Sequence, residues 1–273
     1  MLRTRIVTAL VLMAFLVPAL LAANPLYFAA LTLVMIAAAG WEWARLNRAE
    51  GNVSVALGTL LAGACGVTLG LHWQPPAALW WGSAIAWLIG GAWALRAGVA
   101  AWPRLSPRLR WAIGLALLWL AWLALTQARA RGVNFILSVF CLVWVADIAA
   151  YAGGRAFGRR KLAPSISPGK SWEGVASGML GVLVLAFVWL GVESAAASSL
   201  YGQLQARFGT LGMVAAVLAL AAMSVVGDLF ESLVKRAAGA KDSSGLLPGH
   251  GGVLDRVDAL LPVFPIAMAL ASS

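Results

Sequence analysis

Charged residues are scarce in this chain of 273 residues. They make up 11% of it, whereas soluble domains average about 25%. So few charges exclude an ordinary water-soluble domain. Histidine and cysteine are rarer still, with two of each, and Cys65 and Cys141 share no metal-ligand or redox spacing. We therefore expect both cysteines to be small buried apolar residues.

Apolar residues are abundant, at 62% of the chain, and lipid is the solvent that suits them. The 14 tryptophans and the net charge of +10 fit the same environment, because indoles favour the headgroup zone and basic loops favour the cytoplasmic face. Neither feature requires nucleic acid as a partner. We predict an all-α polytopic membrane protein that forms a single integral domain over residues 1–273, with N-terminal helices in 1–130 and catalytic helices and loops in 131–273.

Nine apolar stretches are long enough, or nearly so, to cross a hydrocarbon core of about 30 Å. The first follows Arg3 and Arg5 and resembles a secretory signal, but we interpret it as a retained helix. The stretches are Ile6–Ala23, Leu26–Trp43, Val53–Leu71, Ala77–Leu95, Trp111–Thr126, Val133–Tyr151, Gly174–Val192, Leu211–Leu229 and Val253–Ala271.

The basic residues are distributed unevenly between the loops. With nine spans, seventeen of the 20 Lys and Arg residues fall on the side of the N-terminus, and only Arg129, Arg131 and Arg207 fall on the other. The positive-inside rule then predicts a cytoplasmic N-terminus and an outside C-terminus.

Acidic residues number only ten, and several lie where membrane helices are expected. Asp147 lies in the sixth stretch, while Asp228, Glu231 and Lys235 share one face at the end of the eighth. Carboxylates inside a membrane usually face a polar cavity or a partner, so function is the default hypothesis. The structural alternative is a helix end with internal Asp228–Ser232 or Glu231–Lys235 pairs.

Two loops combine glycine with basic residues, a composition suited to phosphate. One runs from Lys235 to Asp258; there, Asp255 and Asp258 share a helix face and suit magnesium, although acidic residues in a first helical turn are also favoured structurally. The other presents Ser167-Pro-Gly-Lys170 just before a helix.

At these residues the chain resembles the phosphatidate cytidylyltransferase family, also called CDP-diglyceride synthases. Asp147-Ile-Ala-Ala-Tyr151 and Ser167-Pro-Gly-Lys170 resemble family elements, with Gly169 where many members have lysine. The first 130 residues resemble the family only in hydropathy. The family pattern spans residues 232–258, and its fixed positions are filled by Ser232, Lys235, Arg236, Lys241, Asp242, Pro248, His250, Gly251, Gly252, Asp255, Arg256 and Asp258.

The resemblance implies a magnesium-dependent reaction, with a second cation left open. CTP and phosphatidic acid would give CDP-diacylglycerol and pyrophosphate at the cytoplasmic side of the inner cell membrane, and the family suggests a homodimer. We predict catalytic roles for Asp228, Asp255, Lys235, Arg256 and His250, and metal binding by Asp228, Asp255 and Asp258. The predicted substrate-binding residues are Ser167, Lys170, Lys235, Arg236, Lys241, Asp147, Gly251 and Gly252.

Other interpretations stay open at this point. His250 is either a positioning residue or a general base. An ion or proton transporter would use Asp147, Asp228 and Glu231, but its polar groups should lie near the midplane. A related enzyme acting on another lipid, such as an isoprenoid alcohol or an ether lipid, would hold CTP with the same residues, because these need not distinguish lipid tails. An inactive homologue is disfavoured, because the fixed polar positions are all filled.

Overall fold

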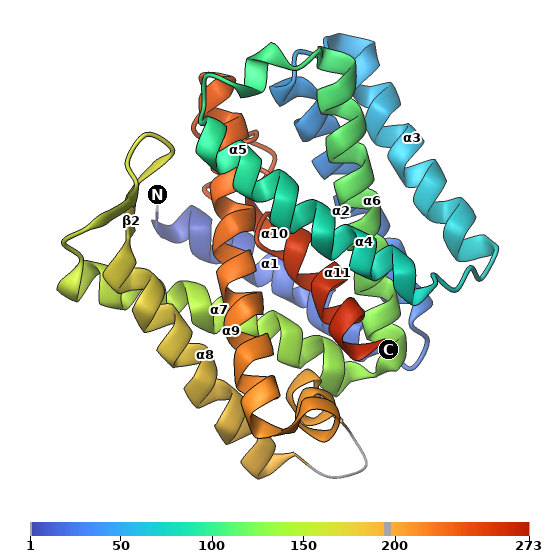
Figure 1. The fold of residues 1–273 in the computed structure, drawn as a ribbon. Helices are drawn as coiled ribbons and strands as arrows, with labels where there is room; N and C mark the ends of the chain where they lie inside the picture. The colour runs from blue at the N-terminus through green and yellow to red at the C-terminus, as the bar shows by residue number, and fades with distance from the viewer. Residues whose placement is uncertain (1, 194–197, 273) are drawn as a thin grey trace.

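The computed structural model describes residues 2–193 and 198–272, which form a bundle of helices (Figure 1). The elements in chain order are α1 Leu2–Leu21, α2 Leu26–Leu46, α3 Gly51–Gly70, α4 Ala77–Ala86, a π turn Trp87–Gly91, α5 Ala92–Ala97, a 3-10 turn Trp102–Arg104, α6 Pro107–Arg131, α7 Val133–Phe157, β1 Lys161–Ala163, β2 Ser167–Ser171, α8 Trp172–Val192, α9 Leu200–Ala237, α10 Leu254–Val257 and α11 Leu260–Ala271.

Within the described residues, seven helical segments are long and apolar enough to cross a membrane. They are α2, α3, the α4–α5 segment Ala77–Ala97, α6, α7, α8 and α9, so the prediction of an all-α membrane protein is confirmed at this level. The first and last predicted spans are shorter: the apolar part of α1 is Ile6–Leu21, and α11 has 12 residues, a length of about 18 Å.

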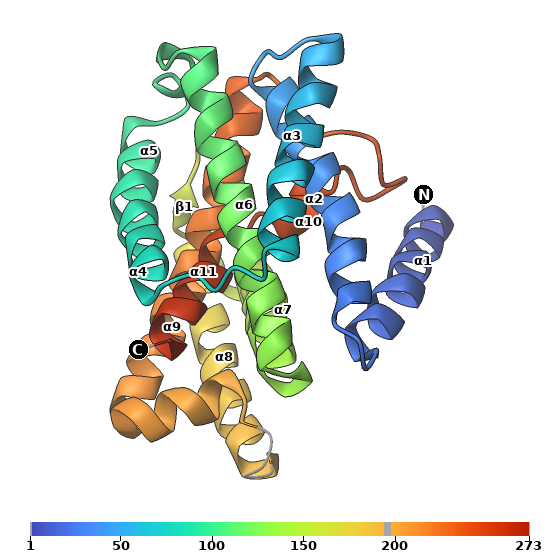
Figure 2. The ribbon, with the colours of Figure 1, turned by 90° about the vertical axis from the view of Figure 1, so that its right-hand side faces the viewer.

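The short helix α11 lies at the centre of the bundle. Its residues from Leu261 to Ala269 are all buried, and it packs against α4, α6, α7 and α9. Figures 1 and 2 both show it inside the ring of longer helices, directly after α10. The predicted last span is therefore divided, because Asp258 and Ala259 separate α10 from α11.

Small residues bring α7 and α8 into close contact. A Cβ atom on Gly174 would lie 2.8 Å from the Ala150 carbonyl oxygen, and one on Gly178 would lie 2.8 Å from that of Ala146. The Gly174–Gly178 spacing is the small-xxx-small pattern of membrane helix pairs. From the sequence alone no such stripe stood out, because small residues occur on many faces.

The loop before α8 folds as an antiparallel hairpin of β1 and β2, an element that the sequence did not predict. Ser171 ends the hairpin and caps α8, since its hydroxyl accepts a hydrogen bond from the Gly174 N–H. The hairpin therefore holds Ser167 and Lys170 on a defined backbone beside the helix start.

Candidate active site

The polar face that the sequence predicts near the C-terminal end of α9 is present in the structure. The Ser232 hydroxyl donates to Asp228 Oδ1 at 3.2 Å, and Lys235 pairs with Glu231 one turn away. Both local pairs of the structural alternative are thus present. Asp228 and Lys235 also reach beyond their own helix, however, so this face connects α9 to two other parts of the chain.

The first connection joins α9 to the hairpin. Lys170 Nζ lies 2.6 Å from Asp228 Oδ2, and both side chains line a polar pocket of about 400 Å³. Asp147 from α7 and Ser167 from β2 line the same pocket. The structure therefore brings together four predicted site residues from three elements.

Two carboxylates, Asp147 and Asp228, and two basic side chains, Arg155 and Lys170, line this pocket. The carboxylates of Asp147, Asp228 and Asp258 are close enough to interact electrostatically, and Lys170 and Lys235 act on them with the opposite sign. Carboxylates that repel one another are stabilised by a cation bound between them. No three His, Cys, Asp or Glu side chains among the described residues form a complete metal site, but magnesium needs only one or two carboxylates when substrate phosphates complete its shell. The donor set therefore fits magnesium.

The second connection joins α9 to the loop before α10. Lys235 Nζ lies 2.5 Å from Asp255 Oδ1, while Asp255 Oδ2 accepts hydrogen bonds from the Gly252 N–H at 2.8 Å and from the N–H and hydroxyl of Ser243, both at 2.9 Å. Four donors therefore already occupy the carboxylate oxygens of Asp255.

Glu42 on α2 is the residue that sequence reasoning missed. Its fully buried carboxylate accepts from the N–H groups of Val253 at 3.0 Å and Leu254 at 2.7 Å. It also accepts from the Ser244 hydroxyl at 2.5 Å and lies 3.1 Å from the Ser243 hydroxyl, whose one proton is shared between Glu42 and Asp255. One carboxylate from the N-terminal half thus fixes both ends of the segment 243–254.

Glycine is needed at positions 251 and 252 because polar side chains lie very close to the backbone there. A Cβ atom on Gly252 would collide with Ser243 Oγ and Glu42 Oε1, and Gly251 has a φ of +78° with Asp255 Oδ2 only 2.6 Å from the Cβ position. Gly251 and Gly252 were predicted to approach a phosphate. The structure shows that they also allow two carboxylates to approach the backbone.

Gly252→Ala is expected to lower activity and thermal stability, because the added methyl group must displace Glu42 or Ser243 at a cost of about 1–3 kcal/mol. Thermal unfolding in detergent and initial rates measure both effects. Gly245→Ala is the matched control, since no atom lies within 4 Å of its Cβ position. Equal rates and equal unfolding temperatures of the two variants would show that a methyl group at position 252 is tolerated.

The remaining predicted residues lie around these two connections. Arg236 donates to the Ile166 carbonyl at 3.4 Å and to that of Ala240 at 3.0 Å, which ties α9 to the hairpin. Lys241 and Arg256 are exposed. His250 Nδ1 is buried and has no hydrogen-bond partner among the described residues.

The architecture is that of an integral membrane protein whose helices enclose a polar site. A model described as the cytidylyltransferase family matches residues 3–273. The phosphatidate cytidylyltransferase of Haemophilus influenzae is 37% identical over 97% of this chain and 96% of its own length. That of Pseudomonas aeruginosa is 37% identical over 99% and 97%, and that of Thermotoga maritima is 42% identical over 51% and 49%.

The chain belongs to the cytidylyltransferase family. The resemblance found in residues 232–258 is thereby confirmed, and the family model extends it to the N-terminal helices that resembled the family only in hydropathy.

Proposed function

We propose that the chain transfers CMP from CTP to phosphatidic acid, giving CDP-diacylglycerol and pyrophosphate for phospholipid synthesis. Full-length similarity to two phosphatidate cytidylyltransferases supports this proposal. The observation that carries it in the structure is the polar pocket where Lys170, Asp228 and Asp147 converge from three elements. Such a pocket suits a triphosphate and a metal better than it suits an apolar ligand.

In this reaction an oxygen of the phosphatidate phosphate attacks the α-phosphorus of CTP in line. The bond from the α-phosphorus to the bridging oxygen of the β-phosphate breaks, and pyrophosphate leaves. The chain supplies no covalent nucleophile. Lys170 and Arg236 hold phosphates from the hairpin side, and Lys241 and Arg256 do so from the loop side, so that two mutually repelling anions are brought together. His250 positions the lipid phosphate.

We assign magnesium binding to Asp228 and Asp258, because their two carboxylates are close enough to interact electrostatically. When bound, the ion neutralises charge on the phosphates as the leaving group departs. The sequence also predicted Asp255 as a ligand. Since four donors already occupy its oxygens, we propose that Asp255 instead orients Lys235 and the loop.

For the topology, we propose nine membrane segments with a cytoplasmic N-terminus, an outside C-terminus and an active site open to the cytoplasm of the inner membrane. The α2–α3 and α5–α6 connections, which carry basic residues, lie at one end of the molecule, and the α6–α7 connection lies towards the other (Figure 2). This arrangement supports the positive-inside assignment. A homodimer is proposed from the family resemblance.

The test supplies purified protein with radiolabelled CTP and magnesium, with and without phosphatidic acid. We expect labelled CDP-diacylglycerol only when both magnesium and phosphatidic acid are present. Asp255→Asn should nearly abolish the product, because loss of a buried ion-pair partner costs about 3–5 kcal/mol and frees the loop. If label instead enters an isoprenoid alcohol or an ether lipid, that lipid and not phosphatidic acid is the acceptor. CTP binding without turnover on any lipid would contradict an enzyme.

A further inference from the structure

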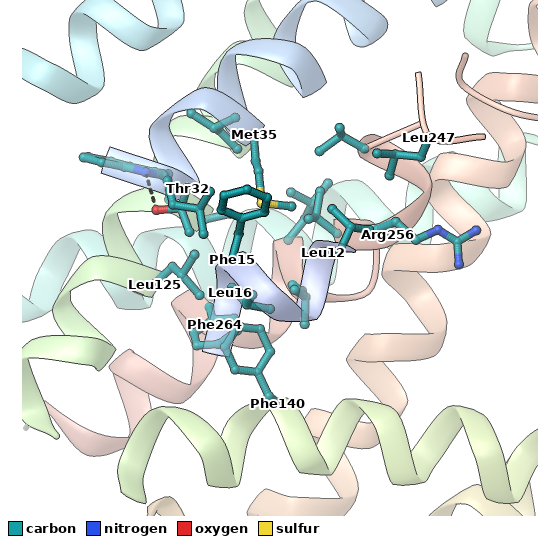
Figure 3. Close-up of a pocket in the computed structure, with 18 of the residues that line it drawn as sticks. Leu12, Phe15, Leu16, Thr32, Met35, Leu125, Phe140, Leu247, Arg256 and Phe264 are labelled. Carbon is teal, nitrogen blue, oxygen red and sulfur yellow. Dashed lines mark hydrogen bonds between the residues drawn. The ribbon is translucent and has the colours of Figure 1, made fainter. Parts of the chain in front are cut away.

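A second, apolar cavity of about 440 Å³ lies beside the polar site, between α1, α2, α6, α7 and α11. Figure 3 shows Phe15 of α1 and Met35 of α2 side by side within it, with Phe140 and Phe264 along one edge. Its volume lies in the range of about 300–1,000 Å³ typical of small-ligand pockets. Helix α7 contributes to both cavities, since Trp144 lines the apolar one and Asp147, one turn further on, lines the polar one.

The cavity has one polar end. Arg256 and Leu247 lie there, whereas Thr32 and Leu125 lie at the opposite end (Figure 3). His250, three residues after Leu247, also lines the cavity. The Arg256 guanidinium makes no hydrogen bond or ion pair with the described residues, and His250 Nδ1 is buried without a partner among them. At the far end the Thr32 hydroxyl is already satisfied, because it donates to the Phe28 carbonyl at 2.8 Å and accepts from Trp122 Nε1 at 3.2 Å.

This polarity matches an anionic amphiphile. A cation and a free nitrogen at one end suit a phosphate, and apolar walls with satisfied polar groups beyond suit a hydrocarbon chain. Arg256 and His250 also belong to the segment that carries the candidate active site. A lipid phosphate held by them would therefore lie beside the site where CTP is proposed to bind.

Helix α1 forms the outer wall. Leu12 and Phe15 line the cavity, while Leu10 on the same helix is 64% exposed and does not. Within the described residues, one side-chain hydrogen bond ties α1 to the active-site loop: the Thr8 hydroxyl donates to the Pro248 carbonyl at 2.8 Å. The wall is thus attached to the loop through Thr8, and at its other end Arg129 Nε of α6 donates to the Leu20 carbonyl at 2.8 Å. Between these two points α1 presents apolar side chains to the cavity.

We propose that this cavity binds one acyl chain of the phosphatidic acid substrate, with its phosphate at Arg256 and His250, and that α1 sets which chains fit. The inference rests on the proposed function and adds a lipid subsite to it. An acyl chain that moves from the bilayer into the cavity passes from one apolar environment to another, so the hydrophobic effect contributes little to its binding. The cavity therefore selects acyl chains by how well they pack.

Leu12→Trp tests the subsite, since it places an indole in the cavity. We expect the KM for dioleoyl phosphatidic acid to rise about tenfold, on the scale of overpacking a filled site. The KM for CTP and the turnover of dihexanoyl phosphatidic acid should stay unchanged, because a short chain leaves the cavity partly empty. Leu10→Trp, on the exposed face of the same helix, is the control. Equal effects on both chain lengths, or equal effects of both variants, would overturn the proposal.

Photo-crosslinking of the unmodified protein gives a second readout that needs no CTP. Phosphatidic acid with a diazirine near the chain terminus should label peptides containing Leu125 or Thr32, and the labelling should fall in Leu12→Trp. Labelling confined to the outward faces of α3 and α8 would sink the subsite. Turnover of phosphatidic acid by the wild-type protein is measured alongside: turnover without cavity labelling defeats only the subsite, and no turnover defeats the proposed function.

Discussion

Glu42→Gln is expected to lower kcat/KM for CTP by about 10- to 100-fold, the scale seen when a residue that orients a site is altered. Glutamine keeps the size of the side chain but replaces one acceptor oxygen with an NH₂ group. One backbone N–H, of Val253 or of Leu254, would then face another donor, whereas the serine hydroxyl at the same oxygen can rotate to accept. Each buried donor without an acceptor costs about 1–3 kcal/mol, and the segment 243–254 would leave its position to avoid that cost.

Initial rates over a range of CTP and lipid concentrations measure this effect, beside thermal unfolding. Glu50→Gln is the control, because Glu50 is exposed at the end of the α2–α3 connection and no hydrogen bond of its carboxylate is found among the described residues. A positioning role predicts that Glu42→Asp, which keeps the charge, recovers part of the rate. Full activity of Glu42→Gln would show that the loop is held by Asp255 alone.

Asp228→Asn is the second large effect, with an expected loss of about 100- to 1,000-fold in kcat, as for removal of one preorganised electrostatic group. The neutral amide weakens the contact with Lys170 and, on our proposal, removes a magnesium ligand. The concentration of magnesium that gives half-maximal rate should therefore rise as well. That shift is the readout that separates a ligand from a residue that only pairs with Lys170.

A double-mutant cycle with Lys170→Met completes the design. Contacting charged pairs show coupling energies of about 0.5–3 kcal/mol, so the double variant should lose less than the sum of the single losses. Additive losses would mean that the Lys170–Asp228 contact has no energetic role in the working enzyme. An unchanged magnesium dependence in Asp228→Asn would refute the metal assignment.

Seven of the nine predicted spans correspond to helices of membrane-crossing length among the described residues, because long apolar runs have few alternatives in lipid, where backbone groups must bond within their own helix. The polar face of α9 could also be predicted, since Asp228, Ser232 and Lys235 lie at helical spacing. Their pairs within the helix involve only neighbouring residues in the sequence. Residues 232–258 identified the family for a different reason, because many fixed polar positions lie close together in the chain.

Contacts between distant segments were not predictable. Glu42 bonds residues more than 200 positions away, and Lys170 meets an aspartate on another element. A signal for Glu42 did exist: it is one of only ten acidic residues and lies within the apolar stretch Leu26–Trp43. The argument that singled out Asp147 and Asp228 applies to it equally. Its partners, however, depend on how α2 packs against the loop.

The bonds from Glu42 to the segment before α10 also bear on how a newly made molecule becomes active. The ribosome delivers α2 long before residues 243–254, and α11 follows later still to fill the centre of the bundle. The Glu42 carboxylate can meet its donors only after residues 243–254 have been synthesised. The segment 243–254 is therefore not yet held in place while the earlier helices insert into the membrane. Catalytic competence therefore arises at the end of biogenesis, and a molecule cut short by its final thirty residues should reach the membrane without turning over substrate.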